Sequence, residues 1–239
     1  MVPIRKGDGT GLAAKGYSQV RKGDGTVLWN AIPDSDLYYP VDEGSGTTLN
    51  DAVSTNHASI TGSPNWVSDS DYWGGFYLDF TEGDYAEISD NSILGLEFDW
   101  SVAVTIIADG SLSDRGVVWN WSNGTDEIGL SIQNESDIAA GWYDGSNWQI
   151  EIGESLPPTP FTIRATVRWD SSDNSMELFT NASEVTGSVQ PTAIQSGDRF
   201  IINESALFSG RQANEGLDAF RVNQDHIDPQ TDYDDQPWS

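Results

Sequence analysis

The sequence contains no cysteine, only two histidines and only three lysines among its 239 residues. Without thiols the chain has no disulfide framework, no cysteine nucleophile and no zinc–thiolate site. His57 and His226 are too few for a histidine-rich metal site. Oxygen-ligated cations such as Ca²⁺ stay open, because Asp and Asn are abundant.

A long apolar run is also lacking. The first residues lead into a Gly/Asp turn rather than the apolar core of a secretory signal, and no stretch approaches the roughly 18 apolar residues of a membrane span. We therefore expect neither a signal peptide nor membrane insertion. Hydrophobic residues still make up 37% of the chain, including ten Trp, which is enough to fill a core.

Charge is distributed unevenly along the chain. The formal net charge is −27, yet residues 1–27 carry five basic side chains against Asp8 and Asp24, a net charge of +3, so the rest carries −30. Such a carboxylate excess strains a compact fold by self-repulsion, which molar salt screens. This pattern indicates a salt-adapted, halophilic protein; an acidic protein that binds divalent cations is the alternative. Nucleic acid is not expected as a partner of the acidic region.

A repeated motif opens the sequence. Arg-Lys-Gly-Asp-Gly-Thr-x-Leu occurs at residues 5–12 and again at residues 21–28. Gly-Asp-Gly predicts a tight turn, because glycine supplies positive φ. The two resulting hairpins are too small to be stable alone. We therefore interpret residues 1–35 as a basic arm that anchors the protein to a partner or another subunit; a flexible arm is the alternative. The anchoring side chains would be Arg5, Lys6, Lys15, Arg21 and Lys22.

Short alternating strands fill residues 36–228. Residues 161–169 are the clearest case, with Phe, Ile, Ala, Val and Trp on one face and Thr and Arg on the other. Similar segments are 76–80, 102–107, 117–121, 148–152 and 199–203. Many short strands at regular spacing predict a sandwich or barrel. Residues 229–239, rich in Asp, Gln and Pro, are interpreted as an acidic C-terminal tail.

Five segments, in order, carry a resemblance to one family. They are residues 37–58, which contain Glu-Gly-Ser-Gly, residues 73–88, residues 98–104, residues 207–210 and residues 216–222. Together they resemble the strands of laminin-G-like jelly rolls in the concanavalin A-like lectin/glucanase superfamily. The resemblance implies an all-β, two-sheet jelly-roll sandwich that follows a short N-terminal β-hairpin arm. Ala219 departs from the family pattern, which has an acidic residue there.

The arm carries a second resemblance. The doubled repeat, followed by Ile-Pro-Asp-Ser at residues 32–35, is similar to N-terminal regions of virion proteins from tailed viruses of haloarchaea. In those proteins such arms precede β-rich, receptor-facing domains. The acidic composition agrees with this resemblance independently.

One motif of the sequence matches a catalytic spacing. Glu82-Gly-Asp84-Tyr-Ala-Glu87 has the Glu-x-Asp-x-x-Glu spacing of laminarinase-type glycosidases, which use two carboxylates across the scissile bond. Those carboxylates must project from a regular strand, whereas Gly83 breaks this one. We interpret the motif as the turn of a hairpin between Phe80 and Tyr85. The chain is therefore predicted not to be an enzyme.

A structural Ca²⁺ is the cofactor that the jelly-roll resemblance implies. The family often holds one where the opening loop meets the closing strand, and Ca²⁺ takes six to eight oxygen ligands. The matching residues are Asp42, Glu43, Asn50, Asp51 and Asp218. Solvated surface acids are the alternative.

Aromatic and arginine side chains are the candidates for a ligand face. Sugars stack on aromatic rings, and arginine pairs bidentately with carboxylates of acidic sugars. The candidates are Trp119, Trp121, Trp142, Tyr143, Trp148, Arg164 and Arg168. For the tryptophans the alternative is a place in the core, and for the arginines it is the balancing of nearby carboxylates.

The sequence thus favours a non-catalytic surface protein of a halophilic virion, as a capsid decoration or tail-fibre component. The arm would bind other virion proteins, the chain would form a homo-oligomer, and the jelly roll would face outward to stabilise the particle or to attach to host-surface glycans. A cellular carbohydrate-binding module or adhesin of a halophile is the alternative. A glucanase-like glycoside hydrolase is the third hypothesis.

Overall fold

The chain divides into two compact units, Met1–Asp34 and Ser35–Ser239. The computed structural model describes residues 19–21, 27–30, 36–72, 75–89, 99–110, 112, 116–143, 145–189, 199–206, 212–213 and 215–234. In the first unit, β1 (Gln19–Arg21) and β2 (Val27–Asn30) pair antiparallel. A hairpin at the second repeat is thereby confirmed. The first repeat and the side chains of the five predicted anchoring residues lie outside the described residues.

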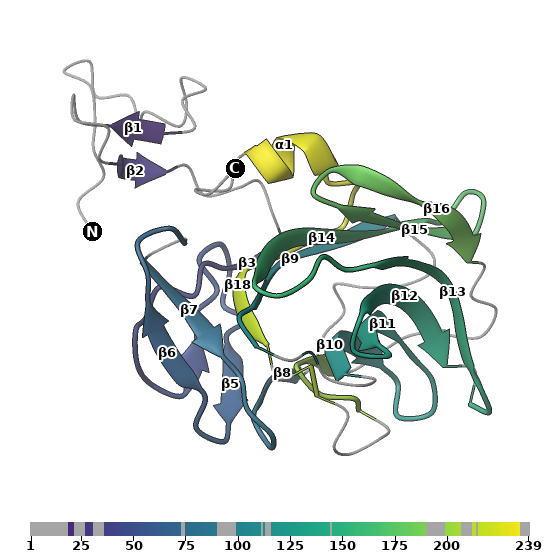
Figure 1. Cartoon of the computed structure of the whole chain (residues 1–239), viewed down its shortest axis with the longest axis horizontal. Helices are drawn as coiled ribbons and strands as arrows, with labels where there is room; N and C mark the ends of the chain where they lie inside the picture. Colours follow the sequence, from purple (N-terminus) through teal and green to yellow (C-terminus); the bar gives the residue numbers. More distant parts are fainter. Residues whose placement is uncertain are drawn as a thin grey trace. The chain divides into compact units, whose positions relative to one another are not determined.

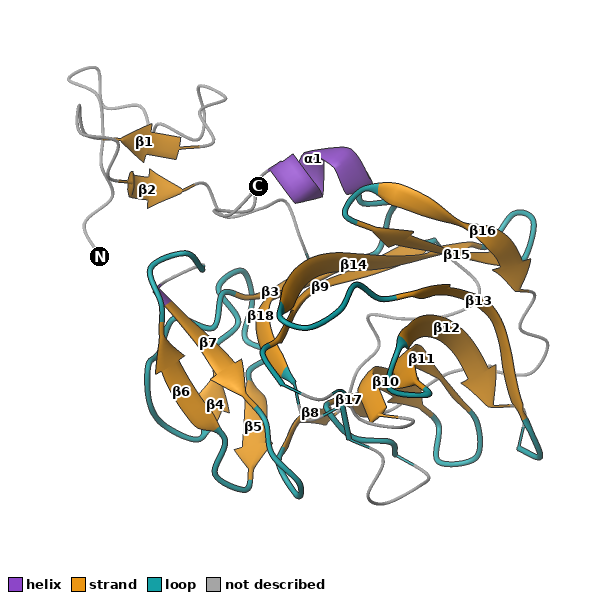
Figure 2. Cartoon of the chain, viewed as in Figure 1, coloured by secondary structure: helices purple, strands orange, loops and turns teal. Residues whose placement is uncertain are grey.

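Two antiparallel sheets form the second unit (Figures 1 and 2). Sheet I contains, in spatial order, β13 (Trp148–Ser155), β12 (Asp137–Tyr143), β11 (Glu127–Gln133), β10 (Gly116–Ser122), β17 (Arg199–Ile202), β8 (Tyr85–Ser89), β5 (Ala58–Thr61) and β4 (Thr48–Leu49). Sheet II contains β16 (Ser183–Val189), β15 (Ser175–Thr180), β14 (Phe161–Asp170), β9 (Trp100–Ala108), β18 (Gly216–Asn223), β7 (Phe76–Asp79) and β6 (Asn65–Ser68), with β3 (Leu37–Tyr39) paired to β18. The prediction of a two-sheet jelly-roll sandwich is confirmed.

An aromatic cluster connects the sheets in the core. Trp119 of sheet I stacks on Phe200 with ring centroids 5.5 Å apart, and Trp100 of sheet II meets Trp119 edge-on at 6.4 Å. Trp100 also stacks on Trp169 of β14, as the alternation of residues 161–169 predicts. These side chains are fully buried. Aromatic pairs in edge-on and offset contacts each contribute about 0.5–1.5 kcal/mol beyond the burial of their surface.

The turn between Phe80 and Tyr85 differs from its prediction. It is a turn, because the Asp84 amide donates to the Thr81 carbonyl oxygen at 3.0 Å and Gly83 has a φ of 91°. It does not close a hairpin, however, because β7 belongs to sheet II and β8 to sheet I. The turn therefore crosses from one sheet to the other.

The outward faces of both sheets are partly covered by other segments of the unit. Over sheet I, the Ser205 hydroxyl donates to the buried Glu127 carboxylate at 2.8 Å, and the Asn203 side-chain amide donates to the Asp84 carbonyl oxygen at 2.8 Å. Over sheet II, the segment that follows β18 ends in helix α1 (Pro229–Asp234). The Ser101 hydroxyl donates to the Asp225 carbonyl oxygen at 2.9 Å. Both faces of β9 and β10 are consequently buried.

Candidate functional site

A cleft of about 390 Å³ lies on the outward side of sheet II, at the end where β9 finishes and β14 begins. Its wall is made by the loop between β6 and β7, by β7 itself and by the residues that follow β9. The lining residues are Asp69, Tyr72, Tyr77, Ile107, Ala108, Asp109, Pro160, Phe161 and Thr162. Two tyrosines and two aspartates thus line one small concave surface, while Phe161, which also lines it, packs against the core.

The two tyrosines form a corner in this cleft. Their ring centroids are 5.2 Å apart and their planes meet at 72°. The Tyr72 and Thr162 hydroxyls are hydrogen-bonded at 2.9 Å, which ties the β6–β7 loop to β14. The loop is also closed within itself, because the Asp71 amide donates to the Asp69 carboxylate at 3.0 Å and the Gly75 amide donates to the Tyr72 carbonyl oxygen at 3.1 Å.

Gly216 makes room for the ring of Tyr77. A Cβ added at this glycine would lie 2.8 Å from the Tyr77 ring and 3.1 Å from the Cβ of Ile107. Gly216 lies in β18, paired with Ile107 on one side and with Asp79 on the other. The ring can therefore lie across the strand because position 216 has no side chain.

Both phenols are neutral over the usual working pH range. Burial raises the pKa of Tyr72, and the negative charge of Asp69 adds to this against the lowering effect of its bond to Thr162. Burial also raises the pKa of Tyr77, with further contributions from Asp109 and Asp79. Each hydroxyl therefore keeps its proton and can donate a hydrogen bond to a ligand.

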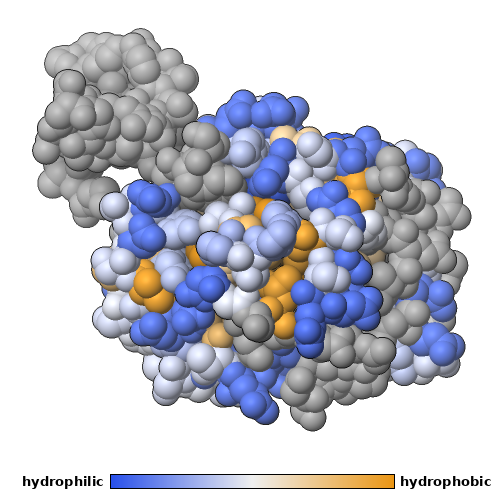
Figure 3. Space-filling model, viewed as in Figure 1, coloured by the Kyte–Doolittle hydropathy of each residue, from blue (hydrophilic) through white to orange (hydrophobic). Residues whose placement is uncertain are grey.

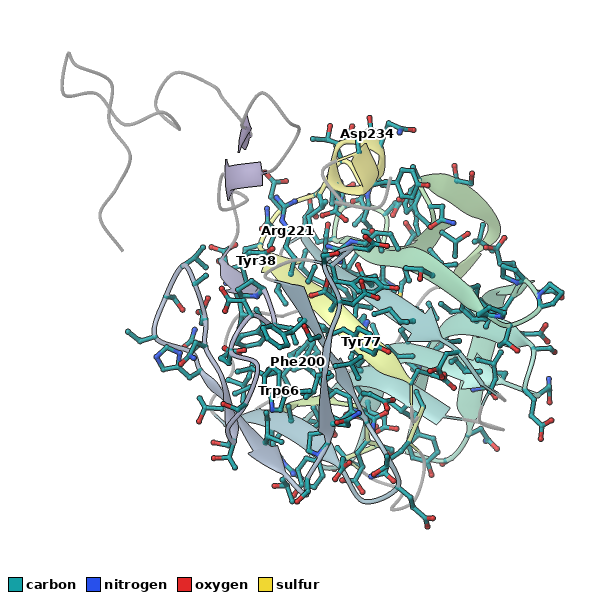
Figure 4. All side chains as sticks on the ribbon, turned by 60° about the vertical axis from the view of Figure 1, so that its left-hand side comes forward. Tyr38, Trp66, Tyr77, Phe200, Arg221 and Asp234 are labelled. Atoms are coloured by element: carbon teal, nitrogen blue, oxygen red, sulfur yellow. The ribbon has the colours of Figure 1, made fainter. Side chains whose placement is uncertain are left out.

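A buried ion-pair cluster occupies the middle of the same outward face. Asp232 of α1 accepts from Arg164 Nε at 2.6 Å and from Arg221 Nη1 at 3.1 Å. Arg164 also donates to the carbonyl oxygen of Ala219 at 2.5 Å. Burial would raise the pKa of Asp232, but the two guanidinium groups outweigh it and hold that pKa below the ordinary value. In Figure 4, Arg221 and Tyr38, which are cross-strand partners, are labelled next to each other, below the helix that carries Asp234.

This cluster corrects two expectations. Arg164 is only 2% exposed and bound to Asp232, so it cannot reach a ligand in this conformation and instead has the alternative role of balancing a carboxylate. The predicted acidic tail begins with α1, and the side chain of Asp232 is part of the packed unit. No local sequence pattern indicates these ion pairs, because the partners of Asp232 lie 68 and 11 residues away.

The other predicted ligand residues have different surroundings. Trp119 and Trp121 are fully buried and Trp142 nearly so, all three in the core cluster, so their prediction as ligand contacts is wrong for this conformation. Tyr143 is half-buried on β12, and the side chain of Trp148 lies outside the described residues.

Arg168 lies further along β14, toward its end. It pairs with Glu177 at 3.4 Å and sits over the ring of Phe179 at 5.2 Å. A ligand role for Arg168 stays a prediction. These partners already provide the alternative role expected for it.

The five predicted calcium ligands do not form one site. Asp51 accepts from the backbone amides of Tyr38 and Val53, each at 3.1 Å, and Glu43 accepts from the Asn50 amide at 2.6 Å. Asp218 accepts from the amide of the next residue at 2.7 Å.

Asp51 and Asp218 act on opposite sides of β3. The negative charge of Asp218 helps burial to raise the pKa of Tyr38, and that of Asp51 does the same for Tyr39, whose side chain points the other way. Asp42 is exposed. Among the described residues, no three acidic or histidine side chains are grouped as a metal would require. Calcium binding itself stays a prediction.

The three carboxylates of the glycosidase-like motif have separate tasks. Asp84 is buried and accepts from the amides of Ser63 at 2.7 Å and Thr81 at 3.0 Å, which joins two turns. Burial alone would raise the pKa of Asp84, but these hydrogen bonds lower it overall. Glu87 pairs with Arg199 at 2.6 Å, and Glu82 is exposed on the turn.

A second hollow, of about 330 Å³, lies at the other edge of the sandwich on β11, β12 and β13. Its floor contains Ala139 and Gly153, and its rim is polar, with Gln133, Asp137 and Glu154. The described lining has no aromatic ring, so it offers hydrogen bonds without a stacking surface. The cleft at Tyr72 and Tyr77 is the better equipped of the two.

Figure 3 shows mostly hydrophilic residues on one face, with hydrophobic ones visible in a few places. Val53, 37% exposed, is the one large hydrophobic side chain that is exposed among the described residues. Among those residues, too, no helix has the length and apolar character needed to cross a membrane.

Comparison with solved structures shows the same fold. The binding domain of botulinum neurotoxin serotype D has a TM-score of 0.61 at 15% identity, covering 84% of this chain and 52% of that one. Domain 4 of AbnA, an extracellular arabinanase from Geobacillus stearothermophilus, in complex with arabinotriose, has 0.63 at 13% identity, covering 84% and 98%. A Trypanosoma rangeli sialidase in complex with the inhibitor DANA has 0.66 at 11% identity, covering 93% and 36%.

This chain spans about half the length of the toxin domain and about a third of the sialidase. No protein-family model matches the sequence, and no curated protein sequence matches it with significance. At these identities the likeness shows a β-sandwich fold and leaves the function to be argued from the site.

Proposed function

We propose that the jelly-roll unit is a non-catalytic carbohydrate-binding or adhesion domain that holds a sugar in the cleft of Tyr72 and Tyr77. The observation that carries the proposal is the aromatic corner, open to solvent and flanked by Asp69 and Asp109. A sugar ring stacks on an aromatic face while carboxylates and phenol hydroxyls accept and donate its hydrogen bonds. Neighbours with this fold include a domain in complex with arabinotriose and a toxin's binding domain, which supports the proposal.

The test is glycan binding by the full chain and by single-residue variants. We expect Tyr72→Ala and Tyr77→Ala each to weaken affinity by about threefold to tenfold, the usual worth of one aromatic contact. Tyr85→Ala removes a half-buried tyrosine from sheet I and is the matched control, expected to leave affinity unchanged. Unchanged affinity in both cleft variants, or no binding of any glycan on an array, would contradict the proposal.

The proposed lack of catalysis is supported by the contacts that the carboxylates of the glycosidase-like motif make. Asp84 is engaged in joining turns and Glu87 in pairing with Arg199, so neither projects as a free acid or nucleophile. A retaining glycosidase needs two carboxylates facing one glycosidic bond. A binding role uses none of these three side chains.

We further propose that the chain is a surface protein of a halophilic virion, in which the arm attaches to other virion proteins and the jelly roll faces outward. The supporting observation is the separation of a basic unit, Met1–Asp34, from a strongly acidic one. Deleting residues 1–34 is expected to abolish incorporation into particles while glycan binding persists. Mass spectrometry of purified particles that finds no such chain would contradict the virion role alone.

A further inference from the structure

The electrostatics of the cleft are one-sided. Asp69 and Asp109 line it, and Asp79 lies beside Tyr77 on the same strand. No basic side chain is among the described lining residues. Arg164 lies two positions beyond Thr162 on the same face of β14, but it is bound to Asp232. The positive charge of Arg164 is thus neutralised by Asp232, which is not among the lining residues of the cleft.

The two tyrosine rings also favour a positively charged ligand group. The faces of tyrosine rings carry partial negative charge, and two rings that meet edge to face at 72° still leave an uncovered ring face beside their contact, where a ligand group can sit. Cations bind over such faces, and recognition of ammonium groups by aromatic cages is a well-established use of the effect. The rings and the carboxylates therefore favour the same kind of ligand group.

We infer that the cleft selects glycans by charge: it prefers sugars that carry a free ammonium group over neutral sugars of the same shape, and it disfavours sugars that carry carboxylate or sulfate groups. This inference rests on the proposed sugar-binding function. An ammonium group in the tyrosine corner would contact an uncovered ring face and lie near Asp69 or Asp109. An anionic group there would meet carboxylates without a described basic partner in the lining.

The experiment compares three forms of one trisaccharide that differ at a single amino group. The group is left free, N-acetylated to make it neutral, or N-succinylated to make it anionic. Each is titrated into the full chain by calorimetry at a pH where the free amine is protonated. The salt concentration is the lowest at which circular dichroism shows the chain folded, and the titration is repeated in molar salt. We expect the free amine to bind about threefold to tenfold more tightly than the neutral form, and the anionic form more weakly than both.

Matched variants separate the cleft from the general acidity of the protein. Asp69→Asn and Asp109→Asn each remove one charge from the lining, and Asn at position 69 still offers an oxygen to the Asp71 amide. Asp173→Asn removes the same charge from the exposed β14–β15 turn, at the opposite end of β14 from Phe161. We expect the ammonium preference to fall by about threefold in the cleft variants and to be unchanged in the control.

The outcomes are distinguishable. Equal affinity for the three forms, or an equal loss of preference in Asp173→Asn, would overturn charge selection while leaving sugar binding intact. Failure of all three forms and of a broader glycan array to bind would instead overturn the proposed function. The preference should also shrink in molar salt, because the Debye length there is only about 3 Å.

Discussion

Two polar regions lie on the outward face of sheet II, and they use their charges differently. In the middle of the face, Arg164 and Arg221 are buried and both pair with Asp232 of α1. At the end of the face, Tyr72 and Tyr77 form an open corner flanked by carboxylates. One region closes the fold, and the other offers groups to a ligand.

The difference follows from what covers each region. A buried carboxylate is tolerated only with opposite charges and hydrogen bonds close by, which Asp232 has. A partly open carboxylate such as Asp69 keeps water as a partner, so it can exchange that water for a sugar hydroxyl. In a chain with a net charge of −27, an acidic side chain does not by itself mark a binding site. What matters is whether other segments of the chain cover that side chain.

The largest expected effect comes from breaking the covered region. Asp232→Asn leaves two guanidinium groups under the helix without their carboxylate, and removing one partner of a buried pair costs about 3–5 kcal/mol. We expect a loss of that size in the free energy of unfolding, measured by denaturant titration at constant salt. Asp234→Asn changes an exposed residue of the same helix and should alter stability by less than about 0.5 kcal/mol. Equal effects in the two variants would show that the buried pairs contribute little.

Acid should remove the same contribution gradually. The folded-state pKa of Asp232 lies below its ordinary value of 3.8, so its stabilisation is fully present above about pH 3.8 and is lost as the pH falls through the folded-state value. The stability difference between the native chain and Asp232→Asn should therefore be constant near neutral pH and shrink in stronger acid. Thermal unfolding across a pH series measures it, and a difference that grows in acid would contradict the assignment.

At the open region we expect a smaller loss of stability than for Asp232→Asn, together with weaker glycan binding. Gly216→Ala places a Cβ against the Tyr77 ring and should cost about 1–3 kcal/mol of stability. The displaced ring should weaken glycan binding by no more than the about threefold to tenfold expected for Tyr77→Ala. Gly110→Ala, where a Cβ meets no atom within 4 Å, is the control for both measurements. Unchanged affinity in Gly216→Ala would remove Tyr77 from the site.

The smallest effect is expected at an ion pair outside both regions. Arg199 is 41% exposed where it pairs with Glu87 on sheet I, so Glu87→Gln should cost less than about 1 kcal/mol. The same variant tests the absence of catalysis. Hydrolysis of β-glucan by the native chain that disappears in Glu87→Gln would show that this carboxylate is catalytic after all.

The fold was largely predictable because strand patterns are local. Residues 161–169 alternate in the sequence as they do in β14, and the opening and closing segments that carried the family resemblance pair as β3 and β18. The strand pattern does not predict which of the two sheets each strand joins. Whether the turn after Phe80 closes a hairpin or crosses between sheets depends on which strands lie beside β7 and β8, and those come from residues far along the chain.

The candidate site was not predictable in the same way. Trp119 and Trp121 are the residue type of a sugar platform, yet they fill the core, while Tyr72 and Tyr77, which are not among the predicted ligand residues, line the cleft. The usable signal was an aromatic on each side of a Gly-Gly pair at residues 74–75, together with the flanking Asp69. These residues form a cleft only because the fold places Tyr72 beside Thr162 and Tyr77 beside Gly216, which are distant in sequence.

By itself, the sequence determined the absence of thiol chemistry, the acidic surface, the basic arm and the alternating strands of a sandwich, because these depend on composition and on near neighbours. The tertiary structure decided which aromatic rings are core and which face solvent, and which arginines are bound by a carboxylate. Both outcomes depend on the segments that cover each sheet, such as α1 over Arg164. Coverage of this kind is a property of packing between distant residues, and no local pattern encodes it.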